Sequence, residues 1–461
     1  MRARAKAVNS ITEGIIWKNM LAFFFPILLG TFFQQLYNTA DAIIVGNFVG
    51  KEALAAVGGT SGTLINLLIG FFVGLSGGAT VIIAQYYGAQ DHENVHKTVH
   101  TAIALGIIGG AALMVIGIIL SGPALHWLGT PEDVYPMSLT YMIVYFVGTI
   151  PNLIYNIGSG ILRAVGDSKR PLYFLIAACL INIVLDLLFV TCFHMGVFGV
   201  GLATIISQFV SAFLVLFVLI RSRLSYRLFV KKIRVHKALL NRIIRIGLPA
   251  GLQSTMYSLS NVLIQASINS FGTDVMAAWT AFGKLDGLLW MTLNAFNVTV
   301  TTFAGQNFGA GKLDRMRKSV RWGMLMACVA AAFIGAVFVI FGRYGLQLFV
   351  SDASTLDFGM RIMLVFAPFY ITYVPIEILS GACRSAGDSL RPMLMTALGV
   401  CGLRLIWLIA VVPNWHELEV LAACYPISWI LTSCLFIVYY LRGGWLKRNM
   451  PQSQESVSTH P

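Results

Sequence analysis

Long apolar stretches alternate with short polar segments along most of the chain. Residues 102–120 and 327–341, for example, contain no charged side chain. A helix that crosses a bilayer needs roughly 20 apolar residues, whereas a strand of a membrane barrel needs about 10 residues of alternating character. The pattern therefore predicts an all-α polytopic membrane protein. It contains twelve expected transmembrane helices, near 17–47, 53–83, 97–121, 134–158, 170–193, 197–220, 246–271, 275–303, 320–345, 358–380, 391–412 and 419–441.

The composition supports the same class. Charged residues make up 11% of the 461 residues and apolar residues 57%, whereas a soluble domain carries about 25% charged residues. Such a chain cannot build a polar shell, which excludes an ordinary soluble enzyme, a disordered protein and a disulfide-stapled secreted domain. None of the seven cysteines forms a Cys-x-x-Cys pair, so we interpret them as small buried hydrophobic residues.

The distribution of positive charge predicts the orientation in the membrane. Of the 32 Lys and Arg residues, 27 lie in the N-terminal segment, the even-numbered loops or the C-terminal segment, and three lie near the opposite side. The positive-inside rule then places both termini in the cytoplasm of a multi-pass protein of the inner (plasma) membrane. We expect a cytoplasmic leader at 1–16 and a cytoplasmic tail at 442–461. The net charge of +13 reflects this orientation, and no nucleic-acid partner is expected.

The chain repeats itself. The segments 160–171 and 381–392 match at seven of twelve positions, with the shared pattern Gly-Asp-Ser-x-Arg-Pro, at an offset of 221 residues. Residues 84–89 and 305–310 resemble each other at the same offset. One offset in two separated motifs indicates a duplication. Because each half holds an even number of spans, we expect two six-helix lobes related by a parallel repeat, at 17–220 and 246–441. The basic segment 221–245 would link them. Gly70, Gly74 and Gly78, four residues apart in the second span, are expected to allow close helix packing.

Buried acidic residues mark the expected site. Asp41 lies in the first span and Asp186 in the fifth, with Asn182 one helical turn before Asp186 and therefore on the same face. Thr204 of the sixth span could reach the same cavity. Carboxylate, amide and hydroxyl oxygens suit a proton or a hard cation such as Na⁺ rather than a transition metal. Burial and mutual repulsion both disfavour the charged carboxylates, so a bound cation would relieve both penalties. The alternative is that each Asp has a structural role.

The C-terminal half differs. Trp407 stands where the repeat would place the counterpart of Asp186, and the buried charges are Glu377 and Arg404. These two residues could form an interhelical ion pair or a second functional site. Lys284 and Asp286 are interpreted as snorkelling or gate residues. We expect His92, His96 and His100 to lie on a solvated helix face, and the chain contains neither a Walker loop nor a His-Glu-x-x-His motif. No cofactor, catalytic residue or metal site is expected beyond a possible Na⁺ at the coupling residues.

These motifs resemble those of the multidrug and toxic compound extrusion (MATE) family over roughly residues 17–442. The resemblance rests on 36–41, 84–89, 160–171, 182–186 and Gly247-Leu-Pro249, with their second-half echoes. It implies two six-helix lobes around a central cleft, and export of organic, often cationic, compounds against Na⁺ or H⁺. It also implies a cation site in the first lobe made by Asp41, Asn182, Asp186 and Thr204. The acid that some members carry after Gly-Leu-Pro is missing here, so a second-lobe cation site of that type is not expected. Candidates for substrate binding or gating are Tyr37, Asn38, Asn156, Glu377 and Arg404.

The sequence hypothesis is therefore a secondary active exporter that exchanges small organic compounds for H⁺ or Na⁺ by alternating access, within the lipid bilayer and as a monomer. A lipid-linked precursor flippase is the first alternative, but it should line its cleft with basic residues, and only Lys284 and Arg404 lie within the spans. A passive channel or a non-transporting sensor is the second, and neither needs a buried carboxylate pair.

Overall fold

The computed structural model describes residues 11–448, so the first ten residues of the expected leader and residues 449–461 of the expected tail lie outside it. The described residues are helical, with no strand among them. By contacts they divide into two units, which we name the N-terminal unit (Phe25–Gly251) and the C-terminal unit (the described residues of Met1–Phe24 and Leu252–Pro461). The boundaries fall inside two long helices, close to Pro26 and Pro249. The lobes at 17–220 and 246–441 stay a prediction.

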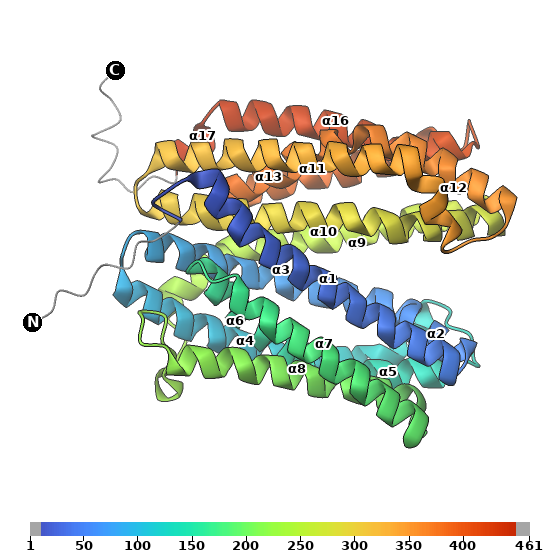
Figure 1. Cartoon of the computed structure of the whole chain (residues 1–461), viewed down its shortest axis with the longest axis horizontal. Coiled ribbons are helices and arrows are strands. Elements are labelled where there is room, and N and C mark those ends of the chain that lie inside the picture. The colour runs from blue at the N-terminus through green and yellow to red at the C-terminus, as the bar shows by residue number, and fades with distance from the viewer. Residues whose placement is uncertain (1–10, 449–461) are drawn as a thin grey trace, which may run out of the picture. The chain divides into compact units, whose positions relative to one another are not determined.

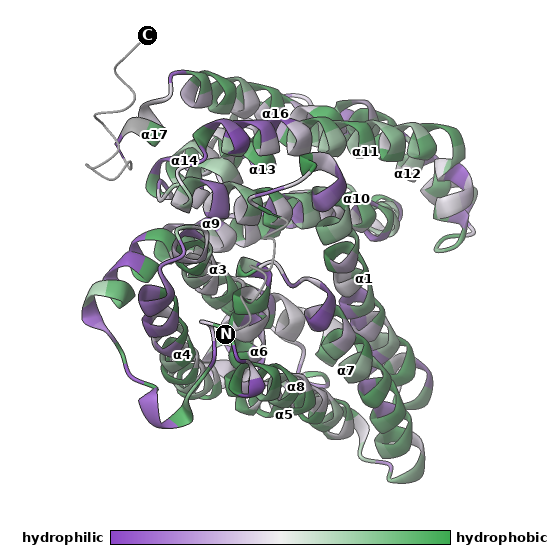
Figure 2. Cartoon of the chain, turned by 60° about the vertical axis from the view of Figure 1, so that its left-hand side comes forward, coloured by the Kyte–Doolittle hydropathy of each residue, from purple (hydrophilic) through white to green (hydrophobic). Residues whose placement is uncertain are grey.

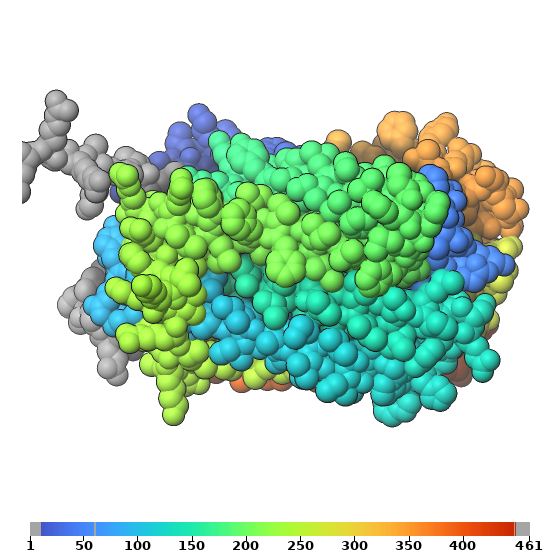
Figure 3. Space-filling view, turned by 90° about the horizontal axis from the view of Figure 1, so that it is seen from below, coloured from blue at the N-terminus to red at the C-terminus, as the bar shows by residue number. Residues whose placement is uncertain are grey.

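Helices of the N-terminal unit pack mainly against the next helix in the chain or the one after it. For example, α6 packs against both α4 and α8 (Figure 1). Figure 3 shows the face of this unit on which α8 is exposed, with the segment 222–236 at one end. The elements are α1 (Ile16–Phe48, shared with the other unit), α2 (Lys51–Gly58), α3 (Thr60–Gly88), α4 (His92–Trp127), α5 (Tyr135–Val147), α6 (Thr149–Ala164), α7 (Lys169–Leu187) with a π-helical extension (Leu188–Cys192), α8 (Gly196–Arg221), a 3₁₀ turn (Val230–Lys232) and α9 (Lys237–Asn269, also shared).

The C-terminal unit is built in the same way, with α10 packed against α11 and α13, and α13 against α16 (Figure 1). Its elements are α10 (Thr273–Gly309), α11 (Leu313–Gln347), α12 (Ala353–Phe366), a 3₁₀ turn (Ala367–Phe369), α13 (Tyr370–Ser385), α14 (Leu390–Thr396), a π-helical segment (Ala397–Gly402), α15 (Leu403–Ala410), α16 (Leu418–Leu441) and α17 (Gly444–Lys447).

Each of the twelve apolar segments coincides with one long helix or with consecutive helices, which confirms the predicted all-α membrane fold. Within the described residues, nine helices or runs of helices are long and apolar enough to cross a membrane, and ten if the bent pair α5 and α6 counts as one span. The remaining two segments, α9 and α10, are equally long but more polar. Figure 2 shows hydrophobic colouring along the long helices and hydrophilic colouring in loops and at helix ends.

Two boundaries differ from the prediction. The fourth segment, expected as one span at 134–158, is two helices that meet at Gly148 with a bend of 49°. A Cβ on Gly148 would lie 2.8 Å from Ile205 of α8, so glycine permits close packing at the bend. The seventh segment begins at Lys237 rather than near 246. Its first turns are basic, and hydropathy detects the bilayer-compatible part of a helix rather than the helix itself.

The segment 222–236, which we name the linker, is fastened to the N-terminal unit. Leu228 is buried in the core formed by α3, α4, α6 and α8. The backbone N–H of Phe229 donates to Nε2 of His100 at 3.0 Å, and His100 Nδ1 lies 2.7 Å from the carbonyl of His96. His100 is therefore a neutral ring that donates through Nδ1. It is 1% exposed, so the expectation of a solvated histidine face is wrong at this position: the linker covers it.

At the end of the linker, His236 is fastened in a similar way. Its backbone N–H donates to the hydroxyl of Thr101 at 3.2 Å, and its Nδ1 lies 3.1 Å from the same oxygen. That hydroxyl donates to the carbonyl of Lys97 and can therefore only accept from His236. Nε2 of His236 accepts from Arg234 at 3.1 Å, so this ring too is held neutral.

Candidate functional site

Three helices of the N-terminal unit bring the predicted coupling residues together. Asp41 lies in the second half of α1 and is 4% exposed, while Asn182 and Asp186 lie one turn apart on α7 and are fully buried. Thr204 on α8 is 1% exposed. The Asp41 carboxylate interacts with the side chains of all three residues. The structure thus brings together four residues of which the first, Asp41, and the last, Thr204, are 163 positions apart in the sequence.

The polar atoms of this cluster are largely unsatisfied. One oxygen of Asp41, both oxygens of Asp186 and both polar atoms of the Asn182 amide are buried without a well-formed hydrogen bond to the described residues. Thr204 donates its hydroxyl proton to the carbonyl of Val200 at 3.0 Å, which leaves its lone pairs free to accept or coordinate. Buried polar atoms in native proteins normally have partners, and these oxygens are of the kind that fits a bound proton or a hard cation.

No basic side chain neutralises these carboxylates. Every ion pair among residues 11–448 involves other acids, and none includes Asp41 or Asp186. The ligands that the cluster offers are carboxylate, amide and hydroxyl oxygens, which prefer a proton or a hard monovalent or divalent cation. No group of three or more His, Cys, Asp and Glu that could hold a metal ion occurs in the described chain.

Tyrosines surround the acidic pair. Tyr37, one turn before Asp41 on α1, is half-buried and interacts with both Asp41 and Thr204. Tyr141 and Tyr145 of α5 also lie close enough to interact with the Asp41 carboxylate. Sequence reasoning did not find these two tyrosines. Their spacing of four residues, on one face of an apolar helix, is the signal that could have identified them.

The other N-terminal candidates lie elsewhere. Asn38, next to Tyr37 in sequence, is exposed, and no hydrogen bond links it to the buried cluster in the described residues. Asn156 on α6 donates its amide to the carbonyl and side-chain oxygens of Asn152, at 2.9 and 2.7 Å. It lines a different cavity, between α1, α6 and α7.

Glu377 and Arg404 do not form the ion pair that the sequence suggested. On α13, Glu377 accepts from the Asn297 amide of α10 at 2.5 Å and from the Tyr373 hydroxyl at 3.3 Å. Arg404 is 2% exposed; its guanidinium lies 3.9 Å from the ring centroid of Tyr425 and donates to Ser428 at 3.2 Å. Glu377 lies on α13 and Arg404 on α15, and the two side chains contact different neighbours. Hydropathy does not give the orientation of each helix about its own axis, so it could not predict these neighbours.

The C-terminal unit offers no counterpart of the acidic pair. Trp407 donates its indole N–H to the carbonyl of Val420 at 2.8 Å. In place of an acid after Gly-Leu-Pro, the hydroxyl of Tyr257 on α9 meets that of Tyr373 at 3.1 Å.

Asp286 departs from the sequence expectation. It is 9% exposed rather than snorkelling, whereas Lys284 is exposed. Its two oxygens accept from the Tyr370 hydroxyl at 2.7 Å and from the Trp290 indole at 2.6 Å. This carboxylate is satisfied by neutral donors, in contrast to Asp41 and Asp186, and an aromatic cluster that includes Trp429 packs around it.

A duplicated bundle of long apolar helices, with an unneutralised carboxylate pair buried between three of them, defines a class of protein: a multi-pass membrane transporter. The MatE family model matches residues 26–188 and 249–408, one segment in each half. The chain therefore belongs to the MATE family of multidrug efflux transporters, which is a family of membrane transporters rather than enzymes.

Relatives match along nearly the full length. The probable multidrug resistance protein YoeA of Bacillus subtilis is 29% identical over 445 residues, which cover 94% of this chain and 95% of the relative. The FAD transporter of Shewanella oneidensis is 25% identical over 406 residues, or 87% and 88% of the two chains. The solved structure of a MOP-superfamily transporter from Pyrococcus furiosus matches with a TM-score of 0.89, at 20% identity, over 97% of this chain and 100% of that chain. This last likeness supports the fold alone.

Proposed function

We propose that the protein is a secondary active exporter that exchanges small organic compounds, often cationic, for H⁺ or Na⁺ by alternating access. The observation that carries the proposal is the Asp41–Asp186 pair, which is buried, lacks a basic partner in the described chain, and leaves carboxylate oxygens without hydrogen bonds. Two carboxylates in one dry site repel each other and each pays a desolvation penalty. A proton or Na⁺ removes both costs, so the pair holds the ion when closed and releases it when water enters.

The residues have distinct roles in this proposal. Asp41 and Asp186 bind the coupling ion, and Asn182 and Thr204 supply neutral oxygens. Tyr37 and Asn38, on the same helix as Asp41, contact substrate or gate its access, as do Asn156, Glu377 and Arg404. No cofactor takes part.

Relatives support the substrate class. The curated names of similar proteins refer to multidrug resistance, multidrug export and FAD transport, all of which move small organic compounds. One charge that crosses the membrane yields about 2.3 kcal/mol per 100 mV, which supports roughly a fifty-fold gradient of a neutral compound. A monovalent cation exchanged one for one with the coupling ion draws nothing from the potential, so a chemical ion gradient must drive it.

The test uses the purified full chain in proteoliposomes with a fluorescent organic cation, under a Na⁺ gradient or a pH gradient imposed separately. We expect one gradient to drive uptake, and Asp41→Asn and Asp186→Asn each to abolish that dependence while the protein stays monodisperse. Glu93→Gln is the matched control, because Glu93 is an exposed carboxylate of the same unit that pairs with Lys97. Gradient-driven uptake that survives both Asp substitutions would contradict the proposed mechanism.

We further propose that the chain lies in the inner (plasma) membrane as a monomer, with both termini and the basic linker in the cytoplasm. The charge bias along the sequence supports this orientation. In a cysteine-free background, a cysteine introduced at Ser222 should react with a membrane-impermeant maleimide only after spheroplasts are opened. Labelling of intact spheroplasts would reverse the topology.

A further inference from the structure

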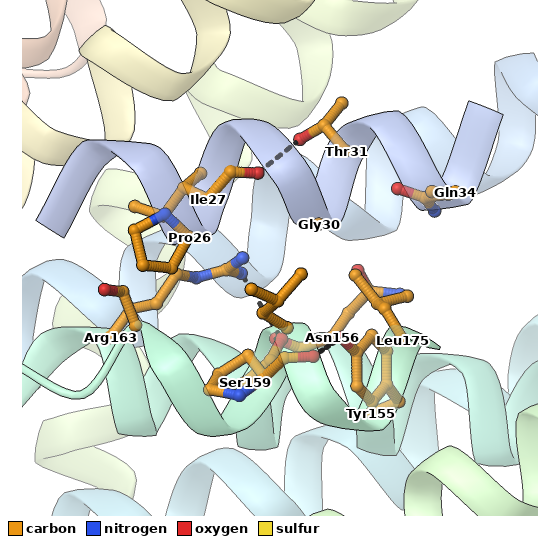
Figure 4. Close-up of a pocket in the computed structure, with 13 residues that line it drawn as sticks. Pro26, Ile27, Gly30, Thr31, Gln34, Tyr155, Asn156, Ser159, Arg163 and Leu175 are labelled. Atoms are coloured by element: carbon orange, nitrogen blue, oxygen red, sulfur yellow. Dashed lines mark hydrogen bonds between the residues drawn. The ribbon is translucent and has the colours of Figure 1, made fainter. Parts of the chain in front are cut away.

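A polar cavity lies within the N-terminal unit, between α1, α6 and α7 (Figure 4). It measures about 60 Å³, which is enough for several water molecules at 10–15 Å³ each. The wall contains none of the residues of the acidic cluster, and Gln34, its member nearest Asp41 on α1, lies seven residues or about 10 Å of helix before it, so the cavity is distinct from the acidic pair. Its polar lining consists of Thr31, Gln34, Asn156, Ser159, Arg163 and Ser168, together with the hydroxyl-bearing Tyr155.

Arg163 is the only cation in this lining, and it has no acidic partner in the described part of the chain. Its guanidinium lies between α1 and α6 and donates one hydrogen bond, to the Ser159 hydroxyl at 3.3 Å (Figure 4). The nearest acid in sequence, Asp167, pairs with Arg170 at 3.3 Å. A guanidinium carries five N–H donors, and Arg163 uses one of them in this hydrogen bond.

The internal repeat shows what this site lacks. At the offset of 221 residues, Arg163 corresponds to Arg384 and Asn156 to Glu377. In the C-terminal unit, the acid Glu377 therefore lies two helical turns before Arg384 on α13. In the N-terminal unit the same position is the neutral Asn156, which bonds to Asn152. One copy of the scaffold thus carries an acid two turns before its arginine, and the other carries a neutral amide there.

The difference is local. The ion pair that follows in each half is kept, between Asp167 and Arg170 at 3.3 Å and between Asp388 and Arg391 at 3.2 Å. A partly buried cation without a counter-ion costs free energy that a bound anion can repay. The planar fork of an arginine matches a carboxylate in two parallel hydrogen bonds.

We propose that Arg163, with Ser159 and Asn156 beside it, binds a carboxylate group of the transported compound. The preferred substrates are then zwitterions or carboxylic acids as well as simple cations. This inference rests on the proposed export function, and it assigns the anion-recognition part of the substrate site to the cavity of Figure 4.

The test compares two probes that differ by one carboxylate: tetramethylrhodamine, which is a zwitterion, and its methyl ester, which is a cation. Binding of each to the purified full chain is measured by fluorescence polarisation. In Arg163→Gln, the affinity ratio of zwitterion to ester should fall about tenfold, as expected for loss of a charge-assisted hydrogen bond. Asn156→Glu recreates the Glu377 arrangement and should lower the ratio similarly, because it supplies an internal counter-ion.

Arg163→Lys keeps the charge but not the fork, so it should retain part of the preference. If Arg163→Gln fails to fold, Asn156→Glu and Arg163→Lys still decide the matter. Equal weakening of both probes, or an unchanged ratio in Asn156→Glu, would overturn the inference and leave Arg163 a structural residue. Gradient-driven transport of the same probes is measured separately: a shifted binding ratio without transport by the wild type would refute the proposed function and not the carboxylate site.

Discussion

Glycines of α3 let its backbone touch that of α9, and an added methyl group should separate the two helices. A Cβ on Gly74 would lie 2.6 Å from the backbone nitrogen of Gly251, and one on Gly78 would lie 2.7 Å from that of Gly247. Ordinary contact begins at about 3.4 Å. The perturbation is therefore Gly74→Ala, the smallest change that fills this crossing.

The structure bounds the size of the effect. The helices must move apart by about 1 Å, because the atoms that the new Cβ meets are backbone and cannot rotate away. Overpacking of this kind costs typically 1–3 kcal/mol. Gly77→Ala is the matched control on the same helix, since its added Cβ would meet nothing within 4 Å. That substitution should be neutral or should stabilise the helix by up to about 1 kcal/mol.

The assay is the apparent thermal midpoint of the purified protein in detergent, followed by size-exclusion chromatography after heating. Gly74→Ala should lower the midpoint by several degrees and Gly77→Ala should not. The double variant Gly74→Ala with Gly251→Ala should cost less than the sum of the single variants, because helices that are already separated accommodate the second methyl group. Equal losses in Gly74→Ala and Gly77→Ala, or none in Gly74→Ala, would refute the backbone contact.

Three further predictions concern other parts of the chain. Arg315→Gln should free the segment 11–14, because the carbonyls of this segment accept three hydrogen bonds from the guanidinium. The local stability of the segment should fall by about 2 kcal/mol, measured as faster hydrogen exchange or proteolysis at 11–14. An unchanged exchange rate would contradict this prediction. Tyr370→Phe should destabilise the C-terminal unit by about 1.5–3 kcal/mol because it removes a donor from the buried Asp286, measured as a lower thermal midpoint than in wild type. Burial and neighbouring positive charges lower the pKa of His236. The hydrogen bonds of His236 should therefore hold the linker fully above pH about 6.5 and weaken as the pH falls below it, because the released histidine takes up a proton first. Hydrogen exchange of the linker that is equally slow at pH 7.5 and 5.5, after correction for intrinsic exchange, would refute this.

Hydropathy and the repeat predicted the number and order of the helical segments, because the bilayer imposes both apolar length and internal hydrogen bonding on each span. The same pattern could not place the bend at Gly148, which depends on how closely α8 approaches. Nor could it find the start of α9 at Lys237, whose first turns are helical but polar. The glycine spacing in α3 predicted close packing, and the structure names α9 as the partner through Gly74 and Gly78.

Residue chemistry predicted part of the site. Asp41 and Asp186 stand out in sequence because a charged side chain in a span is expensive, and the structure brings them together. Their tyrosine neighbours on α5 went unpredicted, since an aromatic residue in an apolar helix is compatible with packing alone. For Arg404 the sequence left two alternatives open, an ion pair with Glu377 and a second functional site. The structure shows the guanidinium against the aromatic face of Tyr425 and the hydroxyl of Ser428 instead of that ion pair.

The two halves of the repeat differ in their buried charged residues. Both keep the same ion-paired turn after the repeated motif, so the fold does not depend on the positions that differ. The differences are buried charges. The N-terminal half has Asp186 where the other has Trp407, and Asn156 where the other has Glu377. The first exchange leaves an unneutralised carboxylate pair and the second an unneutralised guanidinium, both in the same unit. In the C-terminal half, Glu377 and Asp286 are each satisfied by neutral donors. An unpaired buried charge costs stability, and it is useful only where a ligand arrives to pair with it. Both kinds of unpaired charge lie in the N-terminal half, so the proposed coupling site and the proposed carboxylate site both belong to that half of the chain.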